Sequence, residues 1–529
     1  MKLNMVAYLA KSGNVIEDIV NTNANPIYHS IDVSNLNAHL YLKQSPSTPE
    51  WSNLFSGADI PPESFAQRTV KGLLILEVED RYLAFTFGHG RSLLNKNCIE
   101  RGFGLRVAMN LGDPRQLKSI DKSTLDKVAL NTRSQSSKNT GVENFSFEFD
   151  HEIMKSITAI VDREDEELEI VSGKDSVAIY TEISFGTIGR LARRLIEAYR
   201  SDVYKENYPW AEYIMPETDP ELKNILDSLL VTAINARQYD EFWMCAPELI
   251  DYTDFSGFRY SSRSNSPKYT ELNLSSFIAG AGFRGDVSTS TMKSKKVYIL
   301  NSEEMEIDSW SFFQCIGGEL EYEGSKFILN DGVWYSVSDD FYLEVCSYFS
   351  QIPKSALTFP SYGGLKEGPY LRSICNNVDL VLLDQQWVRP RGVANNLEFC
   401  DLYSSCKAII HVKKYGSSAV LNHLFAQAYQ SIEMLVNSPE VIQQVNDHLI
   451  DTQVSLNFNG ASQREHRIVL AIMHHRAGDL DIPFFAKVNL RHHCRKIRGM
   501  GFSVELSKIP IGGVVFNNEL ELKALLEEA

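Results

Sequence analysis

The chain lacks a long apolar run. Nowhere does it approach the ~18 consecutive apolar residues of a membrane-spanning helix, which excludes a membrane protein of that kind. Residues 1–11 also lack the sustained apolar region and the cleavage site of a secretory signal. We therefore expect a cytoplasmic protein that makes no membrane contact.

Paired cysteines are missing as well. The 8 cysteines are scattered, with no C-x-x-C pair and no Cys/His spacing typical of a structural zinc site. This pattern argues against a disulfide framework and a zinc finger. It indicates reduced thiols, as expected in the cytoplasm.

Positive charge is in short supply. The 529 residues carry 52 Lys and Arg against 68 Asp and Glu, a formal net charge of −16. Indiscriminate nucleic-acid binders are usually basic, so any contact with nucleic acid must be local. A hydrophobic share of 43% and a charged share of 23% are globular values, and the length predicts about two to four domains.

Hydrophobic periodicity favours a multidomain α+β fold. Alternating apolar residues predict hairpins over 72–87 and 326–337, and the polar stretch 131–144 is expected to be a loop. The C-terminal third alternates strand and helix patterns, which predicts an α/β domain with a mixed sheet. We expect a β-rich N-terminal domain, a mixed helical and β middle region and this C-terminal domain over residues 1–150, 151–376 and 377–529.

A hairpin near residue 400 places polar groups on an apolar scaffold. Apolar runs over 397–402 and 408–414 flank a short polar segment. A two-residue turn at 404–405 would place Glu398 opposite His411. An acid and a potential metal ligand would then converge.

The length of this turn decides which acid joins the site. A three-residue turn would place Asp401, rather than Glu398, on the face of His411 and Lys413, because side chains in a strand alternate with period two. Both acids therefore remain candidates. Asp384, which ends a buried-strand pattern, is a third candidate.

An acid on one strand and ligand-x-Lys on the next resembles the layout of restriction-endonuclease-like, PD-(D/E)XK, nucleases. The resemblance implies that Glu398, Asp401, His411 and Asp384 hold a divalent cation, Mg²⁺ or Mn²⁺, while Lys413 orients the attacking water. His411 stands where the pattern has Asp, Glu or Gln, and imidazole suits Mn²⁺ or Zn²⁺ better than Mg²⁺. The alternative is structural, with charges at strand ends and an interior histidine.

A helix is expected directly after this hairpin. Apolar residues repeat at helical spacing from Leu421 to Leu435. His423, Gln427 and Gln430 share a neighbouring face. We assign Gln427 a role in positioning the metal or the lysine, and an ordinary solvated helix face is the alternative.

A basic segment lies in the last quarter of the chain. Between Arg464 and Lys508, nine Lys or Arg stand against four Asp or Glu. On the helix expected there, arginines recur at i, i+4 and i+7 on an outward face, where they can hold a phosphodiester backbone. A solvated face balanced by acidic neighbours is the alternative. We predict nucleic-acid contacts from Arg491, Arg495, Arg498 and Lys487.

A glycine-rich turn, Gly88-His89-Gly90-Arg91-Ser92, follows the N-terminal hairpin. Backbone N–H groups at glycines can approach an anion, and an arginine can bind it bidentately. The segment has neither a Walker lysine nor a six-residue glycine pattern, so a plain tight turn is the alternative. Gly88, Gly90 and Arg91 are thus a weak candidate anion site.

Seven segments together resemble a sporadically distributed bacterial family of about this length, over nearly the whole chain. They are Phe87–Arg91, Phe103–Arg106 with Asn110, Gly332–Tyr335, Glu398–Asp401, Ile410–Lys413, His423–Gln427 and Pro483–Leu490. The resemblance implies mobile or restriction-linked gene neighbourhoods, and so antiviral defence. It assigns no catalytic residue.

The leading hypothesis is a metal-dependent nuclease of antiviral defence that acts on DNA or RNA. A second class is a non-enzymatic sensor or scaffold that binds a phage product or a partner protein of a defence system. A third class is an enzyme that acts on a nucleotide or a protein through the Gly88–Ser92 turn. A homo-oligomer is compatible with each hypothesis.

Overall fold

A computed structural model gives the chain a mixed α+β architecture with several sheets. Residues 1–123 and 130–216 form one compact unit, and residues 124–129 and 217–529 form another. Within the described ranges, every helix is too short or too polar to span a lipid bilayer. The structure describes residues 2–33, 36–125, 130–149, 152–161, 168–239, 241–263, 265–283, 285–363, 367–375, 379–390, 397–415, 418–450, 452, 454–458 and 463–512.

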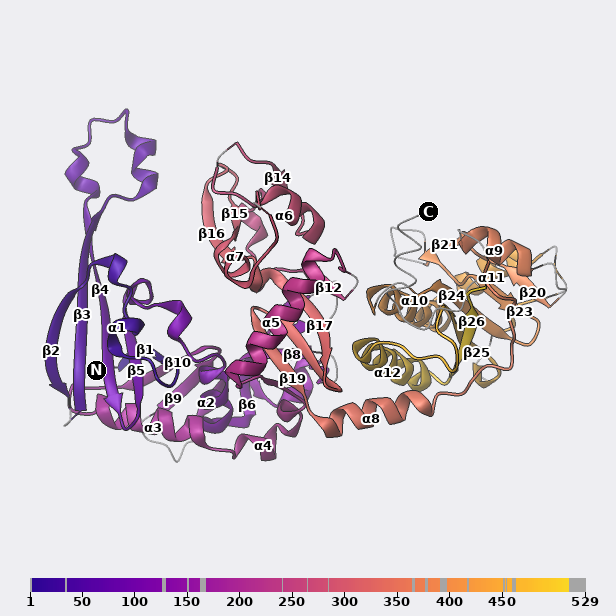
Figure 1. The fold of residues 1–529 in the computed structure, drawn as a ribbon, viewed down its shortest axis with the longest axis horizontal. Coiled ribbons are helices and arrows are strands. Elements are labelled where there is room, and N and C mark those ends of the chain that lie inside the picture. Colours follow the sequence, from indigo (N-terminus) through magenta and orange to yellow (C-terminus); the bar gives the residue numbers. More distant parts are fainter. Residues whose placement is uncertain are drawn as a thin grey trace. The chain divides into compact units, whose positions relative to one another are not determined.

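The first unit is built on one ten-stranded sheet, in the order β2-β3-β4-β5-β1-β10-β9-β8-β6-β7. It is drawn from indigo to magenta in Figure 1. Its strands are β1 (Lys2–Leu9), β2 (Ile27–Val33), β3 (Leu36–Ser47), β4 (Gln67–Val78), β5 (Arg81–Phe87), β6 (Gly112–Thr124), β7 (Asn131–Thr140), β8 (Glu152–Val161), β9 (Leu168–Gly173) and β10 (Ser176–Glu182), and β11 (Ile214–Pro216) ends the unit. Its helices are α1 (Ile16–Ile19), α2 (Phe103–Leu111), α3 (Ile188–Arg200) and α4 (Tyr204–Asn207).

The sheet tests three predictions from the sequence. The hairpin expected over 72–87 is confirmed as β4 and β5. The polar stretch 131–144 was expected to be a loop, but its first part is β7, an edge strand paired with β6. The domain boundary expected at residue 150 falls inside the sheet, because β8, β9 and β10 complete it and the unit continues to residue 216.

In the first part of the second unit, strands pair in the orders β19-β18-β17-β12 and β14-β13-β15-β16. The predicted hairpin over 326–337 is confirmed, with Asp331 and Gly332 at positive φ in its two-residue turn. The elements of this part are α5 (Pro220–Asn235), β12 (Phe242–Met244), β13 (Gly257–Arg259), β14 (Lys268–Tyr269), α6 (Leu274–Gly280), α7 (Thr289–Ser294), β15 (Lys296–Leu300), β16 (Glu306–Ser311), β17 (Ile316–Tyr322), β18 (Ser325–Asn330) and β19 (Val333–Val337).

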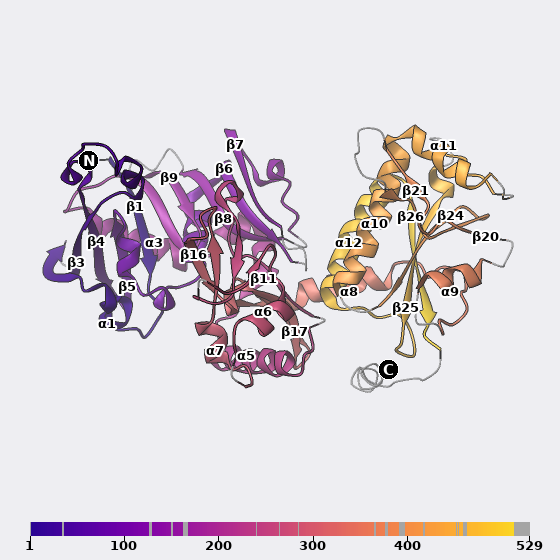
Figure 2. The same cartoon turned by 90° about the horizontal axis from the view of Figure 1, so that it is seen from above.

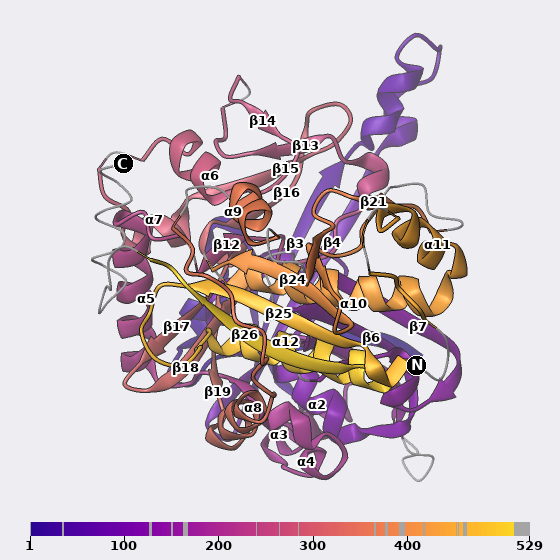
Figure 3. The ribbon, with the colours of Figure 1, turned by 90° about the vertical axis from the view of Figure 1, so that its right-hand side faces the viewer.

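The rest of the second unit surrounds a mixed sheet in the order β20-β23-β24-β25-β26. The strands β20, β23 and β24 are antiparallel, whereas β24, β25 and β26 are parallel and run side by side in Figure 3. The elements are α8 (Asp339–Ser350), α9 (Glu367–Ile374), β20 (Leu380–Leu382), β21 (Trp387–Val388), β22 (Leu397–Glu398), β23 (Leu402–Ser404), β24 (Ala408–Lys414), α10 (Ser418–Asn437), α11 (Pro439–His448), β25 (Arg467–His474), α12 (Phe484–Gly499) and β26 (Ser503–Pro510).

Helices cover both faces of this sheet. Figure 2 shows α10 and α12 on one face and α9 on the other. The apolar residues divide in the same way, because Ile409 packs with α10 and α12, whereas its neighbour Ile410 packs with α9. Both faces are therefore buried, which explains the nearly continuous apolar sequences of β24 and β25.

The hairpin of β23 and β24 has a three-residue turn, with Lys407 in the left-handed conformation. It pairs Leu402 with Ile410, so the two-residue turn at 404–405 was the wrong alternative. Glu398 does not face His411, because β22 leaves this ladder and pairs Glu398 with Trp387 of β21.

Candidate functional site

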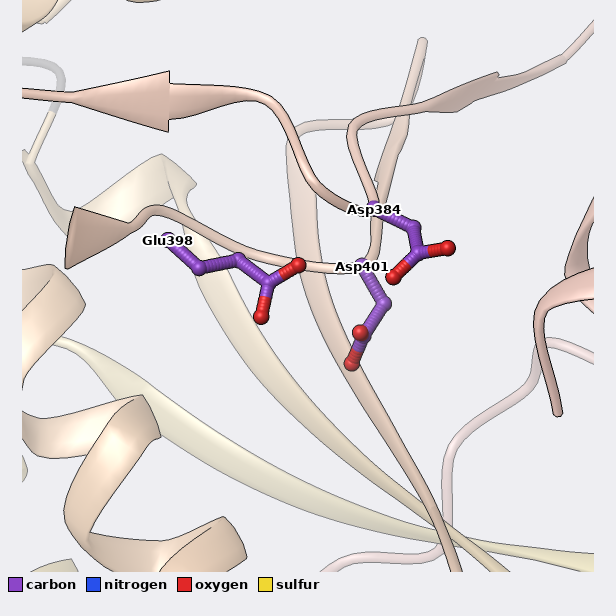
Figure 4. Close-up of side chains that lie close together, drawn as sticks. All are labelled: Asp384, Glu398 and Asp401. Carbon is purple, nitrogen blue, oxygen red and sulfur yellow. The ribbon is translucent and has the colours of Figure 1, made fainter. Parts of the chain in front are cut away.

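Three carboxylates converge near the ends of β20 and β22 and the start of β23, and β22 pairs with β21 in a separate two-stranded sheet. Asp384 follows β20, Glu398 ends β22, and Asp401 directly precedes β23. One oxygen from each lies within 4.8 Å of the others, and Figure 4 shows the three side chains turned toward a common space. The three acids that the sequence singled out are therefore neighbours in space.

Backbone hydrogen bonds fix the three segments against one another. The Oδ2 atom of Asp401 accepts from the N–H of Val412 at 2.6 Å, which ties the acid to β24. The backbone oxygen of Asp401 accepts from the N–H groups of Leu383 and Asp384. Oε1 of Glu398 accepts from the N–H of Gln385 at 2.6 Å. The carboxylates thus belong to a bonded framework and do not sit on free loops.

Burial and mutual repulsion make the cluster electrostatically strained. Burial raises the pKa of Asp401 to about 7, and the charges of Glu398 and Glu367 add to the effect. Burial and the neighbouring Asp384 also raise the pKa of Glu398. A divalent cation would relieve this repulsion, and carboxylate oxygens are the donors that Mg²⁺ and Mn²⁺ prefer. The three side chains fit such an ion.

Lys413 brings a positive charge to the same place. Its Nζ lies 3.1 Å from Oε1 of Glu367. Burial disfavours the ammonium form, but the charges of Glu367, Asp401 and Glu398 outweigh this effect and raise the pKa of Lys413. The amine therefore stays charged and in electrostatic contact with the carboxylates.

Two residues of α9 at this site escaped the sequence analysis. Glu367 is the first residue of the helix, and it pairs with Lys413. A Cβ atom at Gly368 would lie 3.6 Å from Oδ2 of Asp384 and 3.7 Å from Nη1 of Arg372, so Arg372 borders the cluster from the same helix. The residues before Glu367 carry no pattern that points to β24, so only the tertiary fold reveals these contacts.

His411 does not join the cluster, which corrects its assignment as a metal ligand. The side chain is buried at 3% exposure, and its Nε2 lies 3.3 Å from Oγ of Ser431 on α10. Burial lowers the pKa of His411 to about 3, so the ring is neutral. Of the two sequence interpretations, the interior histidine is the one found.

Gln427 lies half-buried on α10, and its backbone oxygen accepts from Oγ of Ser431. The helix itself is confirmed over Ser418–Asn437. The assigned role of Gln427 in positioning a metal or the lysine stays a prediction.

The predicted outward row of basic residues on α12 is wrong for Arg491. Its side chain has 0% exposure, pairs with Glu344 of α8 at 2.9 Å and lies over the ring of Phe341. The helix α8 covers this face of α12, and periodicity alone could not identify the covering element.

The other basic residues of α12 contact either α8 or a residue close to α12 in the sequence. Arg495 and Arg498 lie over the ring of Tyr348, and Arg498 donates to the Tyr348 hydroxyl. Lys487 is largely buried and pairs with Asp481 at 2.7 Å. Lys487 and Arg491 therefore serve packing, whereas Arg495 and Arg498 remain exposed to solvent while they contact Tyr348. Nucleic-acid contacts from these two arginines stay a prediction.

Packing explains the glycines of the Gly88–Ser92 turn. Gly88 has a φ of +58°, and a Cβ atom at Gly90 would lie 2.0 Å from the backbone oxygen of Gly72. The side chain of Arg91 is exposed. The glycines are thus required by a tight turn, and the anion site stays a prediction.

The chain was compared with known proteins. No curated protein and no solved structure matches it significantly. The model of one family, described as a family of unknown function (DUF6119), matches residues 5–510. Because this match spans nearly the whole chain, the protein belongs to the DUF6119 family.

Proposed function

We propose that the protein is a metal-dependent nuclease whose active site is the carboxylate cluster of the C-terminal sheet. The observation that carries the proposal is the convergence of Asp384, Glu398 and Asp401 beside the ammonium group of Lys413. Grouped acids that hold a cation, with a lysine beside them, are suited to hydrolysing a phosphodiester.

The connectivity of the sheet supports the same conclusion. A helix, α9, precedes three antiparallel strands, and α10 then leads to β25, which is parallel to β24. Restriction-endonuclease-like nucleases use a mixed sheet of this kind, with their acids and lysine on its central strands. Asp401 at the start of β23 and Lys413 on β24 match that placement, while the buried His411 departs from it.

Each residue of the cluster would have a separate role in the reaction. Asp384, Glu398 and Asp401 would hold the ion, which polarises the scissile phosphate and lowers the pKa of a bound water. Lys413 remains an ammonium, so it orients the nucleophile or neutralises charge that develops on the phosphate. Glu367 holds the amine in place through their ion pair. Antiviral defence stays a prediction from the family resemblance.

The test is cleavage of plasmid DNA, phage DNA and RNA by the purified full chain with Mg²⁺ or Mn²⁺. Lys413→Ala should abolish cleavage, whereas Lys414→Ala, which removes the neighbouring exposed lysine, should not. Circular dichroism checks that both variants fold. Cleavage that survives in Lys413→Ala overturns the proposal. So does a protein that binds Mn²⁺ at this cluster but cleaves none of the substrates, a result that favours the non-enzymatic sensor.

A further inference from the structure

Two lysines that face each other in the first unit suggest a binding site apart from the carboxylate cluster. Lys43 of β3 and Lys71 of β4 are direct partners across the ladder. Like charges placed directly opposite each other destabilise a sheet, so the pair needs a compensating partner. Lys43 donates to the backbone oxygen of Ala24, and Lys71 donates to Oγ of Ser92. Both acceptors are neutral, and the described residues form no ion pair with either lysine.

The lysines lie where the sheet narrows to two strands. The pairing of β2 with β3 starts at Leu42, and the pairing of β5 with β4 stops at Gly72. Beyond these two pairs β3 and β4 continue together as the arm seen at the indigo end of Figure 1. Among the strands that the structure describes, none other pairs with β3 or β4 there, so solvent and a ligand can reach the two lysines, which are half-buried residues.

A row of aromatic rings adjoins the lysines. Tyr41 and His39 precede Lys43 by two and four residues, so they lie on the same face of β3. Tyr28 of β2 pairs with Tyr41, and its ring lies 5.3 Å from that of Tyr41 and 5.7 Å from that of His39. Tyr28 is 49% exposed. An aromatic surface therefore lies open next to two cations.

Arg91 extends the positive charge on the other side. It is exposed and adjoins Ser92, the acceptor of Lys71, in the short helix Gly90–Leu93. Burial, Tyr28 and the acid Glu17 raise the pKa of Tyr41, so a negative charge also lies near these residues. We call Tyr28, His39, Tyr41, Lys43, Lys71 and Arg91 the lysine patch.

We propose that the lysine patch binds single-stranded nucleic acid. The ammonium groups would contact successive phosphates, and the exposed ring of Tyr28 would stack on an unpaired base. A duplex offers the phosphates but hides the faces of its bases, so it lacks the second contact. The proposal concerns binding in the first unit and does not depend on nuclease activity.

The experiment measures anisotropy of fluorescein-labelled oligo(dT), oligo(U) and a DNA duplex with the full chain in EDTA, which prevents metal-dependent cleavage. Lys43→Gln/Lys71→Gln should weaken single-strand binding at least tenfold at low salt. It should also lower the slope of log affinity against log salt by about 1.4, since each lost phosphate contact removes ~0.7. Tyr28→Ala should weaken single-strand binding about fivefold and leave duplex binding unchanged.

The matched control is Lys118→Gln/Lys138→Gln, which removes the same charge from β6 and β7 of the same sheet. This variant should bind like the unmodified chain. Three results would overturn the proposal: no single-strand binding, equal loss in the control, or an unchanged salt slope in the patch variant. Displacement by polyglutamate as effective as by oligo(dT) would also overturn it, since it would show charge attraction without base stacking.

Discussion

The carboxylate cluster and the lysine patch both bring like charges together, but in different surroundings. Asp401 and Glu398 are held in a largely buried framework, where repulsion is strong enough to raise both pKa values. Lys43 and Lys71 lie at the margin of a sheet, where water screens their repulsion. The comparison teaches that a cluster of side chains with the same charge indicates a ligand of opposite charge. It also teaches that burial determines how strongly the repulsion destabilises the protein when that ligand is absent.

The largest expected effect concerns catalysis at the buried cluster. Asp401→Asn should lower metal-dependent cleavage by roughly 100-fold or more, because the amide is a weaker ligand than the carboxylate it replaces. Asp447→Asn, an exposed acid on α11, is the control and should retain full activity. Initial rates of plasmid nicking measure both. Equal activity in the Asp401 variant would remove the cluster from the reaction and break the comparison.

Metal binding at the cluster should depend on pH. Because the pKa of Asp401 is about 7, its proton competes with the ion below that pH. The affinity for Mn²⁺ should therefore fall about tenfold for each pH unit below 7 and level off above it. Isothermal titration calorimetry in buffers of different ionisation enthalpy would also detect the released proton. An affinity that is flat from pH 5.5 to 8 would contradict this mechanism.

In the absence of a metal ion, Asp401→Asn should increase the free energy of unfolding of the protein. The folded-state pKa of Asp401 lies above its unfolded value of ~3.9, so the folded state binds more protons and stability falls as pH rises from about 4 to 7. Asp401→Asn removes this cost, and we expect a gain of up to about 4 kcal/mol at pH 8, because the two pKa values differ by about 3 and each pKa unit corresponds to ~1.4 kcal/mol. We expect no gain at pH 4, where the carboxyl group is already neutral in the folded state. Urea unfolding in EDTA at both pH values is the measurement. A loss of stability at pH 8 would show that the charge is compensated within the chain.

Some of this site could be predicted from the sequence, because its parts are local. The apolar runs predicted the strands around residue 400, and the acids near their ends marked Asp384, Glu398 and Asp401. The turn length could not be settled, since β24 is buried on both faces and its nearly continuous apolar sequence carries no alternation that would fix the register. It was the left-handed Lys407 that gave the three-residue turn.

The remaining errors concern contacts between distant elements. The row of arginines on α12 was recognised by its spacing, yet periodicity does not say which face another helix covers, and α8 buries Arg491. Glu367 contacts Lys413, which lies 46 residues away in the sequence, and Lys43 pairs with Lys71 because the chain between them folds back as the β3–β4 arm. Likewise β7 is a polar edge strand with no apolar alternation, so only its pairing with β6 reveals it.

Removing the ion-pair partner of Lys413 should have an intermediate effect on the rate of cleavage. Glu367→Gln removes the charge that does most to raise the pKa of this lysine, so the amine becomes easier to deprotonate and less well positioned. Cleavage should fall about fivefold, and its decline at alkaline pH should begin at a lower pH than in the unmodified chain. Glu433→Gln, on the exposed face of α10, is the control. A reduced rate with an unshifted pH profile would assign Glu367 to the fold alone.

The smallest effect should come from a substitution in the lysine patch, Lys71→Gln. The sign of its effect on the free energy of unfolding tests the comparison with the carboxylate cluster. Lys71→Gln relieves the repulsion with Lys43 and keeps a donor for Oγ of Ser92, so the free energy of unfolding should rise by about 0.5 kcal/mol at low salt. The gain should vanish in 0.5 M salt, because screening removes the repulsion in the parent chain, whereas the gain from Asp401→Asn should persist at a buried site. Thermal unfolding of both variants at the two salt concentrations makes the test. A gain from Lys71→Gln that is insensitive to salt would mean that the lysines are no more screened than the carboxylates, and the difference between the two sites would then not lie in their burial.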